Sequence, residues 1–215
     1  MKIRILKSLA VAGTILLSGA QATLAQQQVA IFAGGCFWCV ESDFESVPGV
    51  IKAESGFIGG SADTAKYKTV TKGGTGHYEA VRIVYDPKKV SYDALVHKFW
   101  RTVDPTDAGG QFCDRGDSYR TAVFVTSGEQ KSSATVSKAT AQSELGQKIV
   151  TPILSAGTFY PADEFHQDYY KSNKKVLTRF GLVQRKVAYK KYRKACGRDA
   201  RVKQLWGSAA GQLGS

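Results

Sequence analysis

The sequence predicts an α+β fold: a two-layer sandwich of a mixed β-sheet with helices, with a ferredoxin-like core and an irregular helical C-terminal tail. Two observations predict this class. Short runs of β-branched and aromatic residues alternate irregularly with stretches of helical spacing, and neither an internal repeat nor a low-complexity segment divides the chain. We expect a single domain over residues 26–203, with a basic tail from about residue 171 and a flexible end at 204–215.

Residues 1–25 have the pattern of a signal peptide. Three basic residues precede the apolar run 9–17, which is too short to span a bilayer, and small residues follow it. We expect cleavage after Ala25, with Ala22 as the alternative site, and therefore an exported protein that lies in the periplasm. An uncleaved membrane anchor is the rival interpretation, and the small residues argue against it.

The first strand and the first helix meet at a cysteine. Residues 29–33 have the composition of a buried strand and end at Gly34-Gly35, and apolar residues then recur at helical spacing over 37–47 until Pro48. Cys36 therefore lies on the turn that leads from strand to helix. Unpaired N–H groups and the positive end of the helix dipole favour a thiolate there, so Cys36 is the candidate nucleophile. A buried thiol that only packs under the sheet is the alternative.

The remaining strands are expected where β-branched and aromatic residues gather between turn signals. They are 50–58, 78–85, 119–126 and 151–156, the last at a sheet edge because it contains Pro152. Alternation along 78–85 places Glu79 on one face with Val81, Ile83 and Tyr85. A carboxylate on an apolar face marks Glu79 as a candidate functional residue.

The remaining helices are expected behind capping residues. They are a helix from Ser91 to about residue 100 and a polar helix from Ser127 to about residue 145. Residues 159–164 are expected to open a short helix, and the tail beyond residue 179 is expected to contain helical stretches, with a break between two of them at Cys196-Gly197. The loop 105–118 is rich in Gly and Asp, and loops of this length in compact domains are usually functional.

The net charge of +12 is unevenly distributed, which argues against a nucleic-acid-binding protein. Residues 1–25 contribute +3, residues 26–170 contribute −3, and residues 171–203 contribute +12. Tyr and Val are interleaved with the charges of this basic tail, so a solvated helical face is expected. Contact of the tail with an anionic membrane surface or a polyanion is the alternative.

Four cysteines, Cys36, Cys39, Cys113 and Cys196, are too few for a disulfide scaffold in an exported protein of this size. One Cys-x-x-Cys pair without a second pair does not fit a zinc site. The pair is not followed by His, which covalent haem attachment requires. Redox chemistry is the remaining use of these thiols.

Four motifs, in order over roughly residues 30–170, resemble the A-type peptide methionine sulfoxide reductases. They are Gly34-Gly35-Cys36-Phe37-Trp38-Cys39-Val40-Glu41; Tyr67-x-x-Val70 with Gly76-His77-x-Glu79-Ala80-Val81; Asp114-Arg115-Gly116-Asp117-Ser118-Tyr119-Arg120; and Phe159-Tyr160 with His166-Gln167-x-Tyr169. The Gly-Cys-Phe-Trp element is highly specific for that family. The resemblance implies a catalytic domain that reduces methionine-S-sulfoxide, protein-bound or free.

The resemblance implies a role for each matching residue. Cys36 attacks the sulfoxide sulfur, and Glu79 protonates the sulfoxide oxygen, a role that suits a carboxyl whose pKa is raised by an apolar surrounding. An ion pair between Glu79 and Arg82 or a loop lysine is the alternative. Tyr67 and Tyr119 match tyrosines that bind the sulfoxide oxygen, although buried tyrosines are more often core residues.

Four further matches surround the reacting atoms. Phe37 and Trp38 correspond to the walls that hold the methyl group of the substrate, or are core residues of the helix. Asp114 corresponds to a loop aspartate near the active site, and Tyr169 to an aromatic residue that lines it.

Two positions depart from the family pattern. Pro161 stands where relatives often have a second tyrosine, for which Tyr160 is the nearest substitute. Cys39 stands where relatives frequently have Gly. The sulfenic acid left on the nucleophile needs a resolving thiol. Cys196 in the basic tail matches the resolving position of many relatives, Cys39 is one helical turn away from the nucleophile, and Cys113 adjoins the loop aspartate; all three stay open.

The resemblance implies no metal or organic cofactor, and a thioredoxin-like dithiol as reductant. The runner-up function is an exported thiol–disulfide oxidoreductase that uses Cys36-x-x-Cys39. It would leave Glu79, Tyr67 and Tyr119 without a role. A third class, a binding module that acts through the basic tail, leaves the Cys36 turn unexplained.

Overall fold

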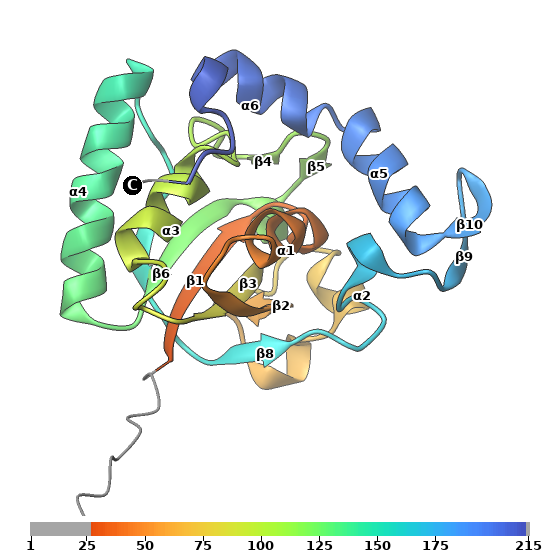
Figure 1. The fold of residues 1–215 in the computed structure, drawn as a ribbon. Coiled ribbons are helices and arrows are strands. Elements are labelled where there is room, and N and C mark those ends of the chain that lie inside the picture. Colours follow the sequence, from red (N-terminus) through yellow and green to blue (C-terminus); the bar gives the residue numbers. More distant parts are fainter. Residues whose placement is uncertain (1–26, 214–215) are drawn as a thin grey trace, which may run out of the picture.

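A computed structural model describes residues 27–213 (Figure 1). The expected signal peptide, residues 1–25, lies outside the described residues, so the cleavage site and the export of the protein stay predictions. Within 27–213, no helix combines the length and the apolar character needed to cross a membrane.

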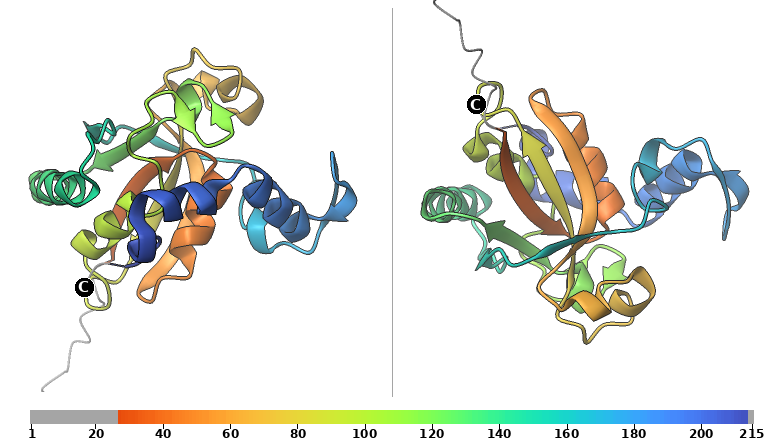
Figure 2. Two further views of the ribbon diagram at one scale, coloured as in Figure 1. Left: turned by 90° about the horizontal axis from the view of Figure 1, so that it is seen from above. Right: turned by 90° about the horizontal axis from the view of Figure 1, so that it is seen from below.

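A six-stranded mixed sheet forms the centre of the fold. In spatial order its strands are β7 (Ile153–Ser155), β6 (Thr121–Val125), β1 (Gln28–Gly34), β3 (Tyr78–Tyr85), β2 (Val50–Ile58) and β8 (Phe159–Pro161). All neighbours are antiparallel except β6 and β7, which are parallel. The predicted mixed sheet with helices is confirmed, as is the edge position of the strand after Pro152. Figure 2 shows the sheet strongly twisted.

Two helices, α1 (Phe37–Glu45) and α3 (Tyr92–Trp100), pack on one face of the sheet. Phe32 of β1 joins them, since its ring centroid lies 5.3 Å from that of Phe44 and 4.9 Å from that of Phe99. Alternation along β1 sends Phe32 into this main core and Ile31 into a smaller apolar cluster. The main core thereby fixes the start of α1 against the sheet.

The remaining elements are short or lie in the second half of the chain. They are the helices α2 (Tyr67–Val70), α4 (Gly128–Leu145), α5 (Arg185–Ala195) and α6 (Arg198–Trp206), the 3₁₀ helices η1 (Ala62–Thr64), η2 (Asp117–Tyr119), η3 (Tyr169–Lys171) and η4 (Gly207–Ala209), and the hairpins β4 (Gly110–Gln111) with β5 (Asp114–Arg115) and β9 (Lys175–Thr178) with β10 (Gly181–Gln184).

The predicted helix caps are confirmed. The Ser91 hydroxyl accepts a hydrogen bond of 3.1 Å from the N–H of Ala94, and the Ser127 hydroxyl accepts one of 3.2 Å from the N–H of Gln130. The break between α5 and α6 is also confirmed, because Gly197 has a φ of +72° and interrupts the helical backbone.

The prediction of a helix opening at residue 159 is wrong. Residues 159–161 form β8, which pairs with β2 so that Gly56 lies opposite Pro161. Gly56 allows this close approach, since a Cβ added there would lie 2.4 Å from Cζ of Phe159 and 2.5 Å from the carbonyl oxygen of Tyr160. Only the short η3, beginning at Tyr169, is helical in this stretch.

The helical stretches expected beyond residue 179 are present as α5 and α6, and a hairpin, β9–β10, precedes them. One expectation for the tail needs correction. The boundary at residue 203 falls inside α6, which continues to Trp206. Trp206 is buried, and the N–H of Gly211 donates a hydrogen bond of 2.7 Å to the carbonyl of Arg101, so these residues pack on α3 rather than forming a separate end.

Candidate active site

Cys36 lies at the turn between β1 and α1, as predicted. It is the N-cap residue of α1, and it is 6% exposed. Gly35 permits the turn, because its φ is +79° and an added Cβ would lie 2.5 Å from Cβ of Gln111. Gln111 is itself held by two hydrogen bonds of 2.8 Å to the backbone of Asp104. The Gly/Asp-rich loop therefore packs directly on the turn that carries the thiol.

The electrostatic environment of Cys36 differs from the prediction. We expected the helix start to lower its pKa; instead burial raises the pKa of Cys36 well above its ordinary value, and the neighbouring Cys39 and carboxylates act in the same direction. The pKa of Cys39 is lowered, first by a hydrogen bond from Cys36 and then by the positive charges of Arg198 and Arg193. The hydrogen bond between the two thiols thus couples their titrations.

Glu79 lies on β3 beside the start of α1. Its Oε2 accepts a hydrogen bond of 3.1 Å from the N–H of Phe37, and its buried Oε1 has no hydrogen-bond partner. Burial raises the pKa of Glu79 to about 8, with a further increase from Asp114 and an opposing effect of the Phe37 N–H. The alternative ion pair with Arg82 is wrong, because Arg82 pairs with Glu54. Glu79 therefore holds a proton at neutral pH, as predicted.

Cys36 and Glu79 line one pocket of about 80 Å³. The other residues that line it are Phe37, Trp38, Tyr67, Asp114, Tyr119 and Tyr192. All but Tyr192 are named by the sequence analysis, so the fold brings together residues from distant parts of the chain as expected. The pocket is small, so it has room for a small group such as the reacting end of one side chain.

Two phenols contribute hydrogen-bond donors to this pocket. Tyr67 comes from α2, and Tyr119 comes from η2, just before the strand that we expected it to begin. Burial raises the pKa of both hydroxyl groups, and the charge of Glu79 raises them further. Both phenols are therefore neutral donors over the physiological pH range.

An aromatic stack forms one wall of the site. The indole of Trp38 stacks on the ring of Tyr169 with centroids 3.8 Å apart and an interplanar angle of 6°. Tyr169 supports Trp38 from behind and is not among the residues that line the pocket. His166 adds to this wall, 4.1 Å from the ring of Tyr67, and burial lowers its pKa to about 4. A neutral imidazole therefore packs here, in a position to which the sequence analysis assigned no role.

Two residues of the tail complete the site, and the sequence analysis did not identify either of them as a site residue. The Tyr192 hydroxyl donates a hydrogen bond to Oδ2 of Asp114, and Tyr192 closes the pocket from α5. Arg198 is 2% exposed and donates a hydrogen bond of 2.9 Å to the carbonyl of Gly34. These contacts span 78 and 164 residues, so no local spacing in the sequence indicates them.

The cysteines are paired in an unexpected way. Cys113 and Cys196 form a disulfide with a Cα–Cα distance of 4.9 Å, which joins the β4–β5 hairpin to the end of α5. Cys36 and Cys39 are buried free thiols in contact with each other. The partner found for Cys196 is therefore Cys113, and the thiol nearest to Cys36 is that of Cys39.

Two groups within residues 27–213 bring three potential metal ligands within 4.8 Å of one another. The first is Cys113, Asp114 and Cys196, and the second is Glu41, Glu45 and Asp168. The two sulfurs of the first group already form the disulfide. In the second, Glu41 accepts hydrogen bonds from Ser55 and from the N–H of Asp168. In both groups, atoms that could bind a metal ion are thus already bonded or hydrogen-bonded within the protein.

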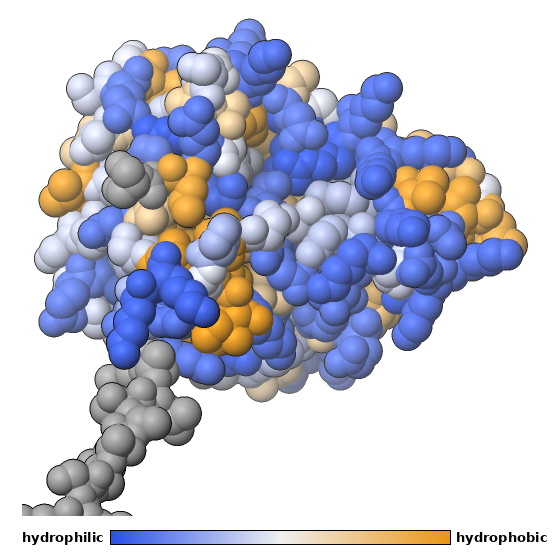
Figure 3. Space-filling model, in the orientation of Figure 1, coloured by the Kyte–Doolittle hydropathy of each residue, from blue (hydrophilic) through white to orange (hydrophobic). Residues whose placement is uncertain are grey.

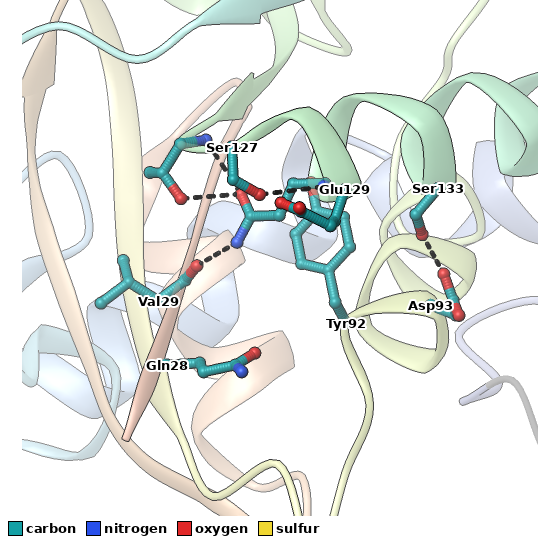
Figure 4. Close-up of a pocket in the computed structure, with 9 residues that line it drawn as sticks. Gln28, Val29, Tyr92, Asp93, Ser127, Glu129 and Ser133 are labelled. Atoms are coloured by element: carbon teal, nitrogen blue, oxygen red, sulfur yellow. Dashed lines mark hydrogen bonds between the residues drawn. The ribbon is translucent and has the colours of Figure 1, made fainter. Parts of the chain in front are cut away.

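A larger pocket of about 560 Å³ lies between the start of β1 and the N-terminal ends of α3 and α4 (Figure 4). Its polar groups bond to one another: Gln130 Nε2 donates to the carbonyl of Val29 at 2.7 Å, and the Ser133 hydroxyl donates to Asp93. No cysteine lines this pocket. The redox chemistry therefore belongs to the smaller pocket at Cys36.

The fold and the site define a class of protein. A buried thiol at a helix start shares a pocket with a protonated carboxyl and two phenol donors, and a second thiol touches the first. This set of groups can attack an electrophilic atom, protonate a leaving oxygen and close an intramolecular disulfide. The class is a thiol-dependent oxidoreductase.

The chain belongs to the peptide methionine sulfoxide reductase family, whose sequence model matches residues 28–201. Similar curated proteins include peptide methionine sulfoxide reductase MsrA 2 of Caulobacter vibrioides, 51% identical over 84% of this chain and 86% of that protein. Another is the MsrA 2 protein of Rhizobium meliloti, 47% identical over 88% of each chain. Their names identify the A type of the family.

Solved structures share the fold. Mxr1 from Saccharomyces cerevisiae in its reduced form has a TM-score of 0.65 and 27% identity, and covers 74% of this chain and 92% of that chain. Methionine sulfoxide reductase A of Corynebacterium diphtheriae has a TM-score of 0.60 and 30% identity, and covers 68% of this chain and 75% of that chain.

Proposed function

We propose that this protein is a peptide-methionine (S)-S-oxide reductase, which reduces methionine-S-sulfoxide, protein-bound or free, to methionine. The observation that carries the proposal is that Cys36 and Glu79 line one pocket, with Oε1 of Glu79 buried and unpartnered. A thiol alone cannot expel a sulfoxide oxygen, because that oxygen leaves only when it is protonated. The pKa of Glu79, raised to about 8, keeps the required proton available.

In the first half-reaction, the sulfur of Cys36 bonds to the sulfoxide sulfur. Its proton passes to Cys39, which accepts its hydrogen bond, and Glu79 gives a proton to the sulfoxide oxygen. The protonated oxygen takes up a second proton and leaves as water, which breaks the S–O bond. Water then attacks the sulfur of Cys36 and returns that proton, so that the new S–S bond breaks, the thioether of methionine leaves and Cys36 is left as a sulfenic acid. The substrate sulfur gains two electrons, and the sulfur of Cys36 loses two.

The pocket selects the reacting end of the substrate. The hydroxyl groups of Tyr67 and Tyr119 donate to the sulfoxide oxygen, and Phe37 and Trp38 contact the methyl group. Because the pocket is only about 80 Å³, the rest of the side chain and the peptide stay outside. This accounts for action on both free and protein-bound methionine sulfoxide.

In the second half-reaction, we assign Cys39 as the first resolving thiol because it touches Cys36. Its thiol condenses with the sulfenic acid, releases water and leaves a Cys36–Cys39 disulfide. The reduced thiols of Cys113 and Cys196 then reduce that disulfide by thiol–disulfide exchange, which leaves Cys36 and Cys39 as thiols and forms the Cys113–Cys196 disulfide. Cys113 is exposed, so an external dithiol can reach the Cys113–Cys196 disulfide and reduce it.

The external reductant is a thioredoxin-like protein, and the two half-reactions require no metal and no organic cofactor. The basic and apolar pattern of residues 1–25 supports export to the periplasm. The rival function, disulfide exchange with other proteins through Cys36 and Cys39, is disfavoured by their burial. They are only 6% and 2% exposed, so a folded protein disulfide cannot reach them.

We also infer that the centre of the fold is ferredoxin-like. Two features support this. Once the short elements η1, α2 and η2 and the β4–β5 hairpin are omitted, the chain order β1-α1-β2-β3-α3-β6 follows the βαββαβ pattern. These four strands lie in the order β6-β1-β3-β2. The outer strands β7 and β8 then extend this core on both sides.

The test of the function is turnover of separated S- and R-sulfoxide epimers of a blocked methionine, with dithiothreitol or a thioredoxin system as reductant. Wild type should reduce only the S epimer, and Cys36→Ser should be inactive with either reductant. Residual turnover by Cys36→Ser, or preference for the R epimer, would overturn the proposal. Insulin-disulfide reduction without sulfoxide turnover would instead favour the rival function.

A second experiment tests the order of the thiols. One equivalent of sulfoxide is added to the fully reduced protein, and the disulfides are mapped by mass spectrometry over time. We expect Cys36–Cys39 first and Cys113–Cys196 later, with Cys39→Ser accumulating the sulfenic acid after one turnover. Early formation of a Cys36–Cys196 or Cys36–Cys113 bond in wild type would contradict the assignment of Cys39.

A further inference from the structure

The β9–β10 hairpin exposes two leucines at one end of the molecule. Leu177 and Leu182 are directly opposite each other in the hairpin, and they are 78% and 64% exposed. On the other face of the hairpin, Val176 and Val183 pack against the apolar cluster that contains Cys36. The inner face is thus fixed to the body of the protein, and the outer face has no partner among residues 27–213. Figure 3 shows an apolar patch with hydrophilic residues around it at the end where Figure 1 places β9 and β10.

The segment around the hairpin is strongly cationic. No Asp or Glu occurs in residues 169–198. Of the basic residues in this segment, only Lys171, Arg193 and Arg198 form ion pairs within the described part of the chain. The basic residues without such a pair are Lys174, Lys175, Arg179, Arg185, Lys186, Lys190, Lys191 and Lys194. These eight side chains leave a positive charge that the body of the protein does not balance.

Aromatic rings lie among these cations. The guanidinium of Arg179 and the ammonium of Lys191 lie 4.9 Å and 5.7 Å from the ring centroid of Phe180, in the loop between the two strands. Phe165 is 42% exposed, and the guanidinium of Arg185 lies 4.0 Å from its ring centroid. Exposed apolar groups and unpaired positive charges therefore occupy the same end of the molecule.

We propose that the β9–β10 hairpin and the cations around it dock the protein on an anionic phospholipid surface. Leu177 and Leu182 enter the boundary between headgroups and acyl chains, and the neighbouring Lys and Arg side chains contact lipid phosphates. A lipid surface fits better than a folded protein partner, because the two leucines project from a narrow hairpin and a fluid surface can surround them. The charge of the segment is complementary to that of acidic headgroups.

The proposed attachment is peripheral and reversible. Two leucine side chains bury too little apolar area for permanent anchoring, and an electrostatic contribution of this kind falls with ionic strength. The hairpin packs on the same apolar cluster as Cys36 and Cys39, so docking holds the redox site close to the membrane. Methionine sulfoxides in proteins at that surface would then be within reach; this last step alone depends on the proposed function.

The test is co-sedimentation with phospholipid vesicles, using the chain that starts at Gln26. This chain is suitable because the sheet and the three apolar clusters of the core lie within residues 27–213. Wild type should bind vesicles that contain phosphatidylglycerol and not vesicles of phosphatidylcholine, and added salt should release it. The double substitution Leu177→Ser with Leu182→Ser should weaken binding by at least about tenfold.

Matched variants separate the hairpin from general surface effects. Val136→Ser removes an equally exposed apolar side chain on α4, 67% exposed, and should leave binding unchanged. Lys190→Glu with Lys191→Glu should also weaken binding by at least about tenfold, and Lys131→Glu with Lys148→Glu should have less effect. Unchanged circular dichroism and unchanged sulfoxide turnover with dithiothreitol would show that each variant is folded.

A direct probe of insertion completes the test. The fluorescence of Leu182→Trp should shift to shorter wavelength with phosphatidylglycerol vesicles, and brominated lipid should quench it. Equal vesicle binding by the Leu177→Ser, Leu182→Ser double variant and by Val136→Ser would overturn the proposal. The proposal would also be overturned if the protein did not bind vesicles but bound a purified acidic thioredoxin through the hairpin. The hairpin would then be a protein-docking surface.

Discussion

The backbone N–H of Phe37 donates a hydrogen bond of 3.1 Å to Oε2 of Glu79. This contact links the residue after Cys36, at the first turn of α1, to the buried carboxyl group on β3. It occupies one carboxyl oxygen and leaves Oε1 buried without a partner. The bond therefore orients the carboxyl group, while the free oxygen is the one that can carry and deliver the proton.

Removing the proton of Glu79 should slow the chemical step. We expect Glu79→Gln to lower kcat for the S-sulfoxide by about 10²- to 10⁴-fold, the usual range for loss of a general acid. The amide of Gln can still accept the Phe37 N–H, so the fold should be retained. Single-turnover formation of methionine measures the step directly, and a change of less than about threefold would show that Glu79 is not the acid.

The same carboxyl sets a pH limit on activity. Since the pKa of Glu79 is raised to about 8 and the protonated form is required, kcat should fall as the pH rises through about 8. The falling limb should be absent in the residual activity of Glu79→Gln. A rate–pH profile of both proteins with saturating substrate checks this prediction, and an identical falling limb in both would contradict it.

Two buried carboxyl groups should make stability depend on pH. Burial raises the pKa of Glu41 to about 7 and of Glu79 to about 8, from an ordinary value of 4.5. A raised folded-state pKa means that the native protein binds more protons than the unfolded chain above pH 4.5. This stabilising contribution is complete below that pH and is lost as the pH rises through about 7 and about 8.

The measurement is urea unfolding across this pH range, on fully reduced protein so that the disulfide does not change. The free energy of unfolding of the wild type should decrease from about pH 5 to about pH 9. The decrease should be smaller in Glu41→Gln and in Glu79→Gln. Parallel curves for all three proteins would mean that neither carboxyl retains its proton in the folded state.

The turn before Cys36 should tolerate no side chain at Gly35. Gly35→Ala combines a φ of +79° with a Cβ 2.5 Å from Cβ of Gln111, so we expect a loss of about 2–4 kcal/mol in the free energy of unfolding and reduced turnover. Gly128→Ala in α4 is the matched control, because nothing lies within 4 Å of its added Cβ. The control should be neutral or stabilising by up to about 1 kcal/mol.

The buried Arg198 should control the reactivity of the thiol pair. It donates to the carbonyl of Gly34 and lowers the pKa of Cys39, so Arg198→Met should leave that carbonyl without its donor and raise the pKa of Cys39. The pH dependence of iodoacetamide labelling, followed at Cys39 by peptide mapping, reports this change. Arg201→Met, which removes the ion pair with Asp104, is the control and should leave the labelling profile in place.

Much of the site follows from local sequence. The turn that carries Cys36 depends on two glycines and a helical repeat beside them, and the position of Glu79 depends on alternation along one strand. Both are short-range patterns, and the structure confirms both placements. The remaining members of the pocket were assigned through the resemblance to the family, because spacing alone does not distinguish Tyr67 or Tyr119 from ordinary core tyrosines.

The predictions that were wrong concern features that depend on contacts between distant residues. Residues 159–161 are a strand because Gly56, about a hundred positions earlier, leaves room for Phe159 beside β2. The pKa of Cys36 rises chiefly because the thiol is buried, and no property of the turn reveals that burial.

The sequence by itself determined the mixed sheet with helices, the cysteine at the first strand-to-helix turn and the carboxyl on an apolar strand face, since each follows from spacing within a few residues. Only the tertiary structure decided which thiols meet, that Tyr192 closes the pocket and that the hairpin leaves Leu177 and Leu182 uncovered. These outcomes depend on how the tail packs against the sheet, and that packing brings together side chains that are far apart along the chain.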